Sequence, residues 1–230
     1  HKMKVLFVNP PNIRSDTSTV ENGFAVKAFI VPPFLGKFKL AQMLFRRLNK
    51  ITGLGSSVRY GVRAGSRWPF TMDQPLSDYA PYPFFMGYAA SNLRQHGFDV
   101  NILDAVAEME YDYANFLQKI KLEESDIVVI ECSTPTIDID VWFANKIADF
   151  SKVALAGPHL NQTTVEEIKA DNPKITFYLI GEYILSSLKM AKSKKSGVYE
   201  SEVLKDIDSV PTPFRDYKSA IKYFDPSMPT

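Results

Sequence analysis

Five short apolar runs rich in β-branched residues recur along the chain and constrain its fold more than any other feature. They are Lys4 to Val8, Asp99 to Leu103, Asp126 to Ile130, Lys152 to Ala156 and Ile175 to Ile180. Each is almost continuously apolar, as is typical of strands buried on both faces of a parallel sheet. Segments with helical spacing separate the later four: Tyr113 to Leu122, Ile137 to Phe150 and Thr164 to Ala170. This alternation predicts an α/β fold with a doubly wound, five-stranded parallel sheet in the flavodoxin-like order 2-1-3-4-5.

A further helix is predicted ahead of the second run, in the stretch PFFMGYAASNLRQHG. Pro83 suits its first turn, and Gly97 follows as a stop. The spacing places these side chains on the face expected to contact the core: Phe84, Phe85, Tyr88, Ala89 and Leu93.

A long insertion, about residues 12–80, separates the first run from that helix, where a βα loop usually has two to six residues. Within it, Lys37 to Ile51 has amphipathic helical spacing. We favour a core-packed helix with a solvated basic face over a helix that binds a membrane surface or a partner. The glycine-rich residues 53–70 do not stand between a strand and a helix as a phosphate loop does, and we expect a mobile or substrate-facing loop.

Composition excludes several classes of protein. Lysine and arginine number 27 against 26 acidic residues, so the charge balance does not favour nucleic acid or an anionic membrane as a partner. The single cysteine, Cys132, excludes an internal disulfide and a cysteine-cluster metal site, and it suits a cytoplasmic protein. No transmembrane segment or signal peptide is predicted, and we expect His1 and Lys2, ahead of Met3, to be a remnant of expression.

In an open parallel α/β sheet, ligands bind outside the carboxyl ends of the strands, where the strand order reverses. The residues expected at that edge are Asn9-Pro10-Pro11, Asp104-Ala105, Cys132 to Thr136, Gly157-Pro158-His159 and Gly181-Glu182. Most are small or polar, which favours a binding surface over a catalytic constellation. The sequence therefore predicts no catalytic residue and no metal ligand.

Sharper interpretations of this edge fail. The paired acids of a phosphoacceptor receiver are missing after the first run, and so is the Gly-x-Gly-x-x-Gly of a dinucleotide site. Cys132 is expected to be structural and not a thiolate nucleophile paired with His159. His159 alone is expected to be a hydrogen-bonding loop residue and not a metal ligand.

Taken in order, KVLFVNPP, YPFFMGYAASNLRQHGFDVNILDA, DIVVIECSTPT, KVALAGPHLNQTTVEEI and ITFYLIGEYILSSL resemble the N-terminal cobalamin-binding domain of cobalamin-dependent radical S-adenosylmethionine enzymes. The resemblance covers residues 3 to about 192, apart from the insertion. The stretch LKDIDSVPTPFRDY resembles the segment that leads from that domain into the radical barrel. The resemblance implies a Rossmann-like cobalamin domain at 3–192 and a linker at 193–230 toward a barrel outside this chain. Four prolines favour extended chain in this linker: Pro211, Pro213, Pro226 and Pro229.

The resemblance also implies which residues bind the corrinoid. Ser133, Thr134 and Thr136 would line the path of its nucleotide tail. Gly157, Pro158 and His159, together with Gly181 and Glu182, would flank the corrin edge and the nucleotide, and Asn9 and Pro10 complete the expected set.

Two departures from related patterns limit the expected chemistry. The histidine that ligates cobalt in methionine-synthase-like domains follows the first strand, where this chain has Asn9-Pro10-Pro11-Asn12, so histidine ligation is not expected. The C-x3-C-x2-C motif of a radical enzyme is also missing, so the [4Fe-4S] cluster and S-adenosylmethionine would belong to the full-length enzyme, and this chain alone should not be catalytic. Tyr183 stands where the family commonly has glycine, in Gly-Glu-Tyr-Ile.

The expected function is therefore cobalamin binding within a methyltransferase or an enzyme of a related radical transformation. The alternative is a non-catalytic α/β interaction domain that has lost the ligand. A flavin or nucleotide binder on the same scaffold would rest on fold analogy alone.

Overall fold

The computed structural model describes residues 2–11, 81–108, 110 and 112–217, with Leu44 and Tyr223 as single positions. The chain divides into two units, His1–Asn12 with Val62–Thr230 and Ile13–Gly61, and all the described helices and strands belong to the first. Apart from Leu44, the predicted insertion, its amphipathic helix and its glycine-rich loop lie outside the described residues.

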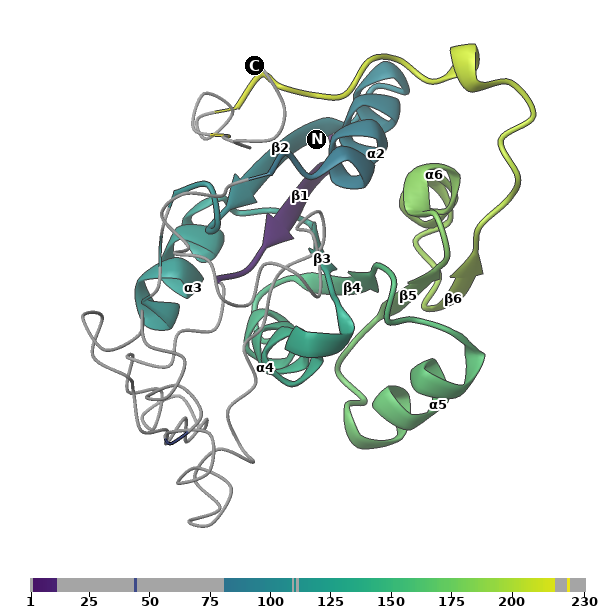
Figure 1. The fold of residues 1–230 in the computed structure, drawn as a ribbon. Helices are drawn as coiled ribbons and strands as arrows, with labels where there is room; N and C mark the ends of the chain where they lie inside the picture. The colour runs from purple at the N-terminus through teal and green to yellow at the C-terminus, as the bar shows by residue number, and fades with distance from the viewer. Residues whose placement is uncertain are drawn as a thin grey trace. The chain divides into compact units, whose positions relative to one another are not determined.

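A parallel sheet of six strands, in the order 2-1-3-4-5-6, forms the centre of this unit (Figure 1). The strands are β1 (Lys4–Asn9), β2 (Asp99–Asp104), β3 (Ile127–Glu131), β4 (Lys152–Ala156), β5 (Phe177–Ile180) and β6 (Gly197–Glu200). Every pairing is parallel, and β1 lies between β2 and β3. The predicted α/β class and the order 2-1-3-4-5 are confirmed, but the predicted number of five strands is wrong.

The sixth strand comes from the segment predicted to be linker. β6 pairs with β5 from Phe177↔Gly197 to Ile180↔Glu200. Its side chains alternate between half-buried and exposed, and Tyr199 packs against the core. Because β6 has only four residues and one covered face, no continuous apolar run marks it in the sequence.

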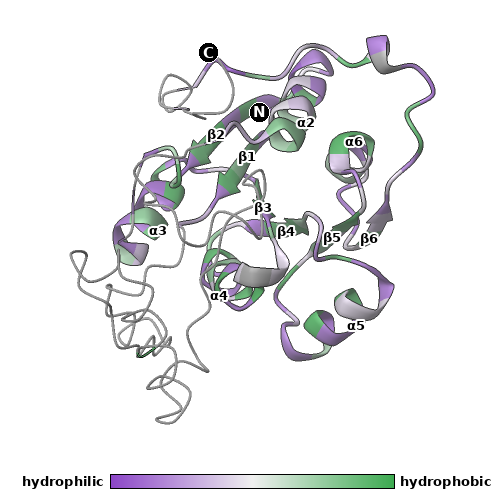
Figure 2. Cartoon of the chain, in the orientation of Figure 1, coloured by the Kyte–Doolittle hydropathy of each residue, from purple (hydrophilic) through white to green (hydrophobic). Residues whose placement is uncertain are grey.

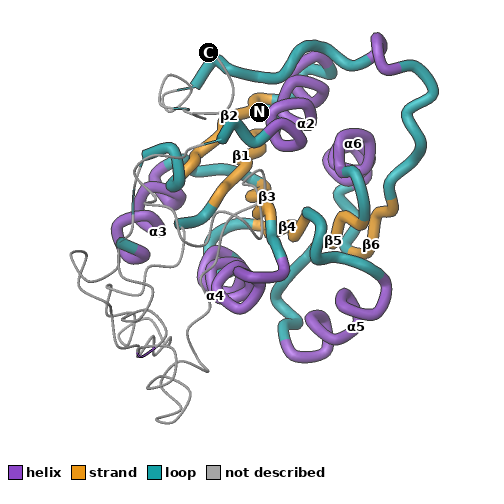
Figure 3. Tube along the Cα trace, viewed as in Figure 1, coloured by secondary structure: helices purple, strands orange, loops and turns teal. Residues whose placement is uncertain are grey.

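Helices cover both faces of the sheet (Figure 3). α2 (Phe84–Gln95) and α6 (Tyr183–Ser193) pack together on one face, whereas α3 (Tyr113–Leu122) and α4 (Ile137–Ile147) pack together on the other. α5 (Gln162–Asp171) connects β4 to β5, and Oδ1 of Asn161 caps it by accepting a hydrogen bond from the amide of Thr164 at 3.0 Å. No helix within the described ranges is both long enough and apolar enough to cross a membrane.

In β1, β2 and β3, every second side chain points into the core under α2 and α6. Val5 and Phe7 of β1, Val100 and Ile102 of β2, and Ile127 and Val129 of β3 all contribute to it. Figure 2 shows β4 and β5 in the green of hydrophobic residues, as expected for strands covered on both faces.

α2 has the predicted position, and Gly97 follows it with φ +88°, but of the predicted core face only Ala89 and Leu93 are buried. Phe84 and Phe85 are each 49% exposed. The side chains that do reach the core are Met86, Ala89, Ala90 and Leu93. The buried face of α2 is thus rotated from the predicted one. Gly87 explains this rotation, because a Cβ there would lie 1.9 Å from the hydroxyl of buried Tyr82.

After β6 the chain returns to α2 (Figure 1). We call residues 201–217, together with Tyr223, the tail. The hydroxyl of Tyr82 donates to the carbonyl oxygen of Phe214 at 2.6 Å, and the amide of Phe214 donates to the carbonyl oxygen of Gly87 at 3.0 Å. The Phe214 ring is 7% exposed and belongs to the core cluster. Residues far into the predicted linker therefore complete the core of the domain.

Candidate functional site

The carboxyl ends of the six strands share one edge, because all the strands run in parallel. The direction in which successive strands are added reverses at β1, since β2 lies on one side of it and β3 on the other. Ligands of open α/β sheets bind at such a point. The loops that follow β1, β3 and β4 are therefore the candidate site.

Three polar side chains form a row across the ends of these strands. Asn9, Asp104 and Glu131 continue the alternation of the core residues beneath them, so they point to the face covered by α2 and α6. Asn9 pairs with Asp104, and the pairing of Val8 with Ile130 places Glu131 on the other side of Asn9. The three are 2%, 0% and 4% exposed, respectively. We call them the polar row.

Asp104 accepts hydrogen bonds at both carboxyl oxygens. Oδ1 accepts from Nδ2 of Asn9 at 3.0 Å and from the amides of Val106 and Ala107 at 2.9 and 3.3 Å. Oδ2 accepts from the hydroxyl of Tyr223, in the tail, at 2.7 Å. Burial raises the pKa of Asp104 to about 6, although these donors act in the opposite direction.

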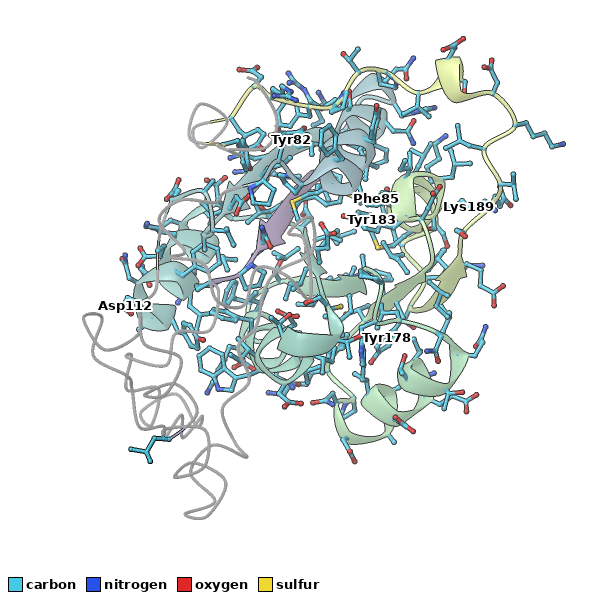
Figure 4. All side chains as sticks on the ribbon, viewed as in Figure 1. Tyr82, Phe85, Asp112, Tyr178, Tyr183 and Lys189 are labelled. Carbon is cyan, nitrogen blue, oxygen red and sulfur yellow. The ribbon has the colours of Figure 1, made fainter. Side chains whose placement is uncertain are left out.

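Glu131 has a single hydrogen-bond donor, the hydroxyl of Tyr183, which lies 2.8 Å from Oε2. Tyr183 is the first residue of α6 and is labelled in Figure 4. Burial raises the pKa of Glu131 to about 7; the hydrogen bond from Tyr183 lowers it, and the negative charge of Asp104 raises it further. Tyr183 thus lies beneath the edge of the sheet, where its hydroxyl donates to the polar row.

The loop after β3 turns two of its predicted ligand-binding hydroxyls inward. Oγ of Ser133 and Oγ1 of Thr136 are 2.8 Å apart, and Oγ1 of Thr136 donates to Oδ2 of Asp140 at 2.6 Å. The amide of Ser133 also donates to this carboxylate, at 3.4 Å. Ser133 and Thr136 are 6% and 1% exposed, so their hydroxyls join the loop to α4.

Thr134 and His159 form the exposed part of the same edge. Nδ1 of His159 lies 3.2 Å from Oγ1 of Thr134, which joins the loop after β4 to the loop after β3. Partial burial lowers the pKa of His159, opposed by the charges of Asp138 and Glu167, so the imidazole is neutral at neutral pH. This pair offers a hydroxyl and a neutral ring nitrogen at the carboxyl ends of β3 and β4, next to the reversal point.

Gly157 allows these two loops to approach each other closely. Its φ is +115°, and a Cβ there would lie 2.4 Å from the carbonyl oxygen of Cys132. The thiol of Cys132 is buried and donates to the carbonyl oxygen of Ala156 at 2.9 Å. The glycine therefore serves contact between protein loops, and the thiol faces the interior.

The structure divides the ten predicted site residues by exposure. Thr134, Pro158, Gly181 and Glu182 are exposed and His159 is half-buried, whereas Asn9, Pro10, Ser133, Thr136 and Gly157 are buried. Asp104, Glu131, Tyr183 and Tyr223 were missed as site residues. Alternation along the first three strands could have placed Asp104 and Glu131 beside Asn9, but nothing in the sequence places the two tyrosines there.

No group of three or more His, Cys, Asp or Glu side chains that could hold a metal ion occurs in the part of the chain that the structure describes. Comparisons with protein-family models, with curated proteins and with solved structures found no match for this chain.

Proposed function

We propose that this chain is a cobalamin-binding domain of a cobalamin-dependent radical S-adenosylmethionine enzyme, with the corrinoid on the carboxyl edge of the sheet. The observation that carries the proposal is the contact between Thr134 and His159. It joins the two loops that the family resemblance assigns to the cofactor, and one of them follows β3, which borders the point where the strand order reverses.

The exposed residues fit such a ligand better than the buried ones do. Thr134, His159 and Glu182 supply polar groups, and Gly181 adds no side chain that would obstruct a macrocycle. Ser133 and Thr136 do not fit the path of a nucleotide tail, because their hydroxyls are buried and bonded to each other. We therefore assign cofactor contact to the exposed set alone.

Cobalamin, when bound, would supply a methyl group or take part in a related radical transformation. The three thiolates of a [4Fe-4S] cluster would have to come from outside this chain, whose one cysteine, Cys132, is buried. In this proposal the residues of this chain bind and orient the corrinoid and cleave no bond.

The test is retention of hydroxocobalamin. Wild-type protein that has been mixed with hydroxocobalamin and desalted should keep the corrinoid absorption band. Thr134→Tyr should weaken binding at least about tenfold, or roughly 1.4 kcal/mol, because a bulky side chain would obstruct the exposed edge. Its melting temperature should stay close to that of the wild type, since Thr134 is exposed.

Gln118→Tyr is the matched control, because it adds the same ring at an exposed position of α3 near the amino ends of the strands. This variant should bind like the wild type. Loss of the band from folded wild-type protein, or equal weakening by both tyrosines, would contradict the proposal.

A non-catalytic interaction domain is the second candidate, and one observation favours it. The hydroxyl of Tyr223 donates to Asp104, the last residue of β2, so a side chain of the chain itself covers this carboxyl group. An edge closed by its own chain would suit a domain that has lost its ligand. This candidate would be supported if neither the folded wild type nor the folded variant Tyr223→Ala retained corrinoid.

A further inference from the structure

Two carboxyl groups of the polar row are buried without a counter-ion. Asp104 and Glu131 are 0% and 4% exposed, and no ion pair joins either to a basic side chain among the described residues. Asn9 separates them, and the register places all three in neighbouring strands about 4.8 Å apart. Two adjacent negative charges in so dry a place are strongly unfavourable unless something neutralises one of them.

An unpaired oxygen lies in the same row. Oδ1 of Asn9 is buried and has no hydrogen-bond partner among the residues that the structure describes. Since Nδ2 of this amide points to Asp104 on the β2 side, Oδ1 is directed to the β3 side, where Glu131 lies. A buried acceptor without a donor is unfavourable, and a protonated carboxyl group of Glu131, on the neighbouring strand, would supply one.

We propose that Asp104, Asn9 and Glu131 form a proton-binding site, in which Glu131 holds one proton and donates it to Oδ1 of Asn9. The proton comes from solvent and forms an O–H bond on one Glu131 oxygen, while the other oxygen keeps its hydrogen bond from Tyr183. Asp104 remains the acceptor of its present donors. One proton thus satisfies the unpaired oxygen and halves the charge of the row.

A proton fits this site better than a metal ion does. The oxygens of Asp104 already accept from four donors, and the row is almost inaccessible to the waters that a hard cation usually keeps. The elements that cover the row contribute Tyr183 from α6 and Tyr223 from the tail, and the buried residues of α2 are uncharged. The raised pKa of Glu131, about 7, agrees with a proton held at neutral pH.

The consequence is a site that exchanges a proton near neutral pH beneath the candidate binding edge. A ligand or partner there would meet a row with one negative charge between about pH 6 and pH 7 and a row with two above about pH 7. This inference does not depend on cobalamin, because every contact that carries it lies within the chain.

Infrared difference spectroscopy tests it on the whole chain. The spectrum of the wild type minus that of Glu131→Gln should show the carbonyl stretch of a protonated carboxyl at pH 6, and this band should fade as the pH rises through about 7. Glu182→Gln, which changes an exposed carboxyl at the same edge, should leave the band in place. In Tyr183→Phe the band should disappear at a higher pH, because this variant lacks the hydrogen bond that favours the ionised form of Glu131.

Unfolding by urea gives an independent measure. The folded pKa of Glu131 lies above the model-peptide value of 4.5, so its stabilising effect is complete below about pH 4.5 and is lost as the pH rises through about 7. Glu131→Gln should remove this part of the pH dependence, and Glu182→Gln should not. If Glu131→Gln does not fold, the shift in Tyr183→Phe decides the question.

Three results would overturn the inference. The first is the absence of a protonated carboxyl band at pH 6, and the second is an unshifted band in Tyr183→Phe. The third is binding of Mg²⁺ or Ca²⁺ at millimolar concentration that abolishes the band in the wild type and is lost in Glu131→Gln, since the row would then be a metal site.

Discussion

Gly157 shows how one residue sets the distance between two loops of the candidate site. Its left-handed φ of +115° is unfavourable for any side chain, and its nearest neighbour, the carbonyl oxygen of Cys132, belongs to backbone that cannot rotate away. The contact between Thr134 and His159 depends on this close approach of Gly157 to Cys132, because Thr134 lies two positions after Cys132 and His159 two positions after Gly157.

We expect Gly157→Ala to lower the free energy of unfolding by about 3 kcal/mol, since left-handed strain and overlap with the Cys132 carbonyl act together. Gly97→Ala is the control, because Gly97 also has a positive φ but nothing lies within 4 Å of its added Cβ. Its cost should be about 1–2 kcal/mol. Urea unfolding of both variants measures the difference, and equal losses would show that close packing of the two loops is unimportant.

β6 packs against the core through one side chain, that of Tyr199. Tyr199 packs against the core and its ring lies 6.3 Å from that of Phe177, whereas Val198 points outward and is 39% exposed. A four-residue strand at the edge of a sheet has few other contacts.

Tyr199→Ala should therefore lower the free energy of unfolding by about 1–2 kcal/mol and speed amide exchange in β6. Val198→Ala should change stability by less than about 0.5 kcal/mol, because its side chain is exposed. Hydrogen exchange and urea unfolding of the two variants check this. Equal effects would mean that β6 is held by its backbone pairing alone.

The elements also show what the sequence could predict. Runs such as Asp126 to Ile130 predicted the central strands, because burial on both faces demands continuous apolar residues. β6 has no such run, and the rotation of α2 involves Tyr82, which is held in turn by Phe214, a residue remote from α2 in sequence. The polar row follows from alternation once the strands are placed, but the unpaired oxygen of Asn9 and the position of Tyr183 arise from tertiary packing.

At the scale of the whole unit, the tail is part of the domain and not only a connection. Phe214 is buried beside α2, Arg94 lies over its ring at 4.6 Å, and Tyr82 holds its carbonyl oxygen. The segment that follows β6 is therefore attached to α2 through Phe214.

Phe214→Ala should lower the free energy of unfolding by about 3 kcal/mol, because it empties a buried site in the core cluster. Val203→Ala, in the same segment but 88% exposed, should have almost no effect. Thermal or urea unfolding measures both. A neutral Phe214→Ala would mean that the tail rests on the surface without stabilising it.

The strand order also determines how this sheet can form on the ribosome. β2 and β3 dock on opposite sides of β1, and from β4 onward every strand docks beside the one synthesised just before it, so the sheet then grows outward in one direction as the chain emerges. Each intermediate carries a freshly exposed edge until its successor arrives, and unpaired strand edges promote aggregation. β6 ends this series with an exposed glutamate at its last position, Glu200, and two lysines just before it, Lys194 and Lys195. If synthesis stalls before β6, the apolar edge of β5 stays unpaired and can contact other nascent chains on the same messenger RNA.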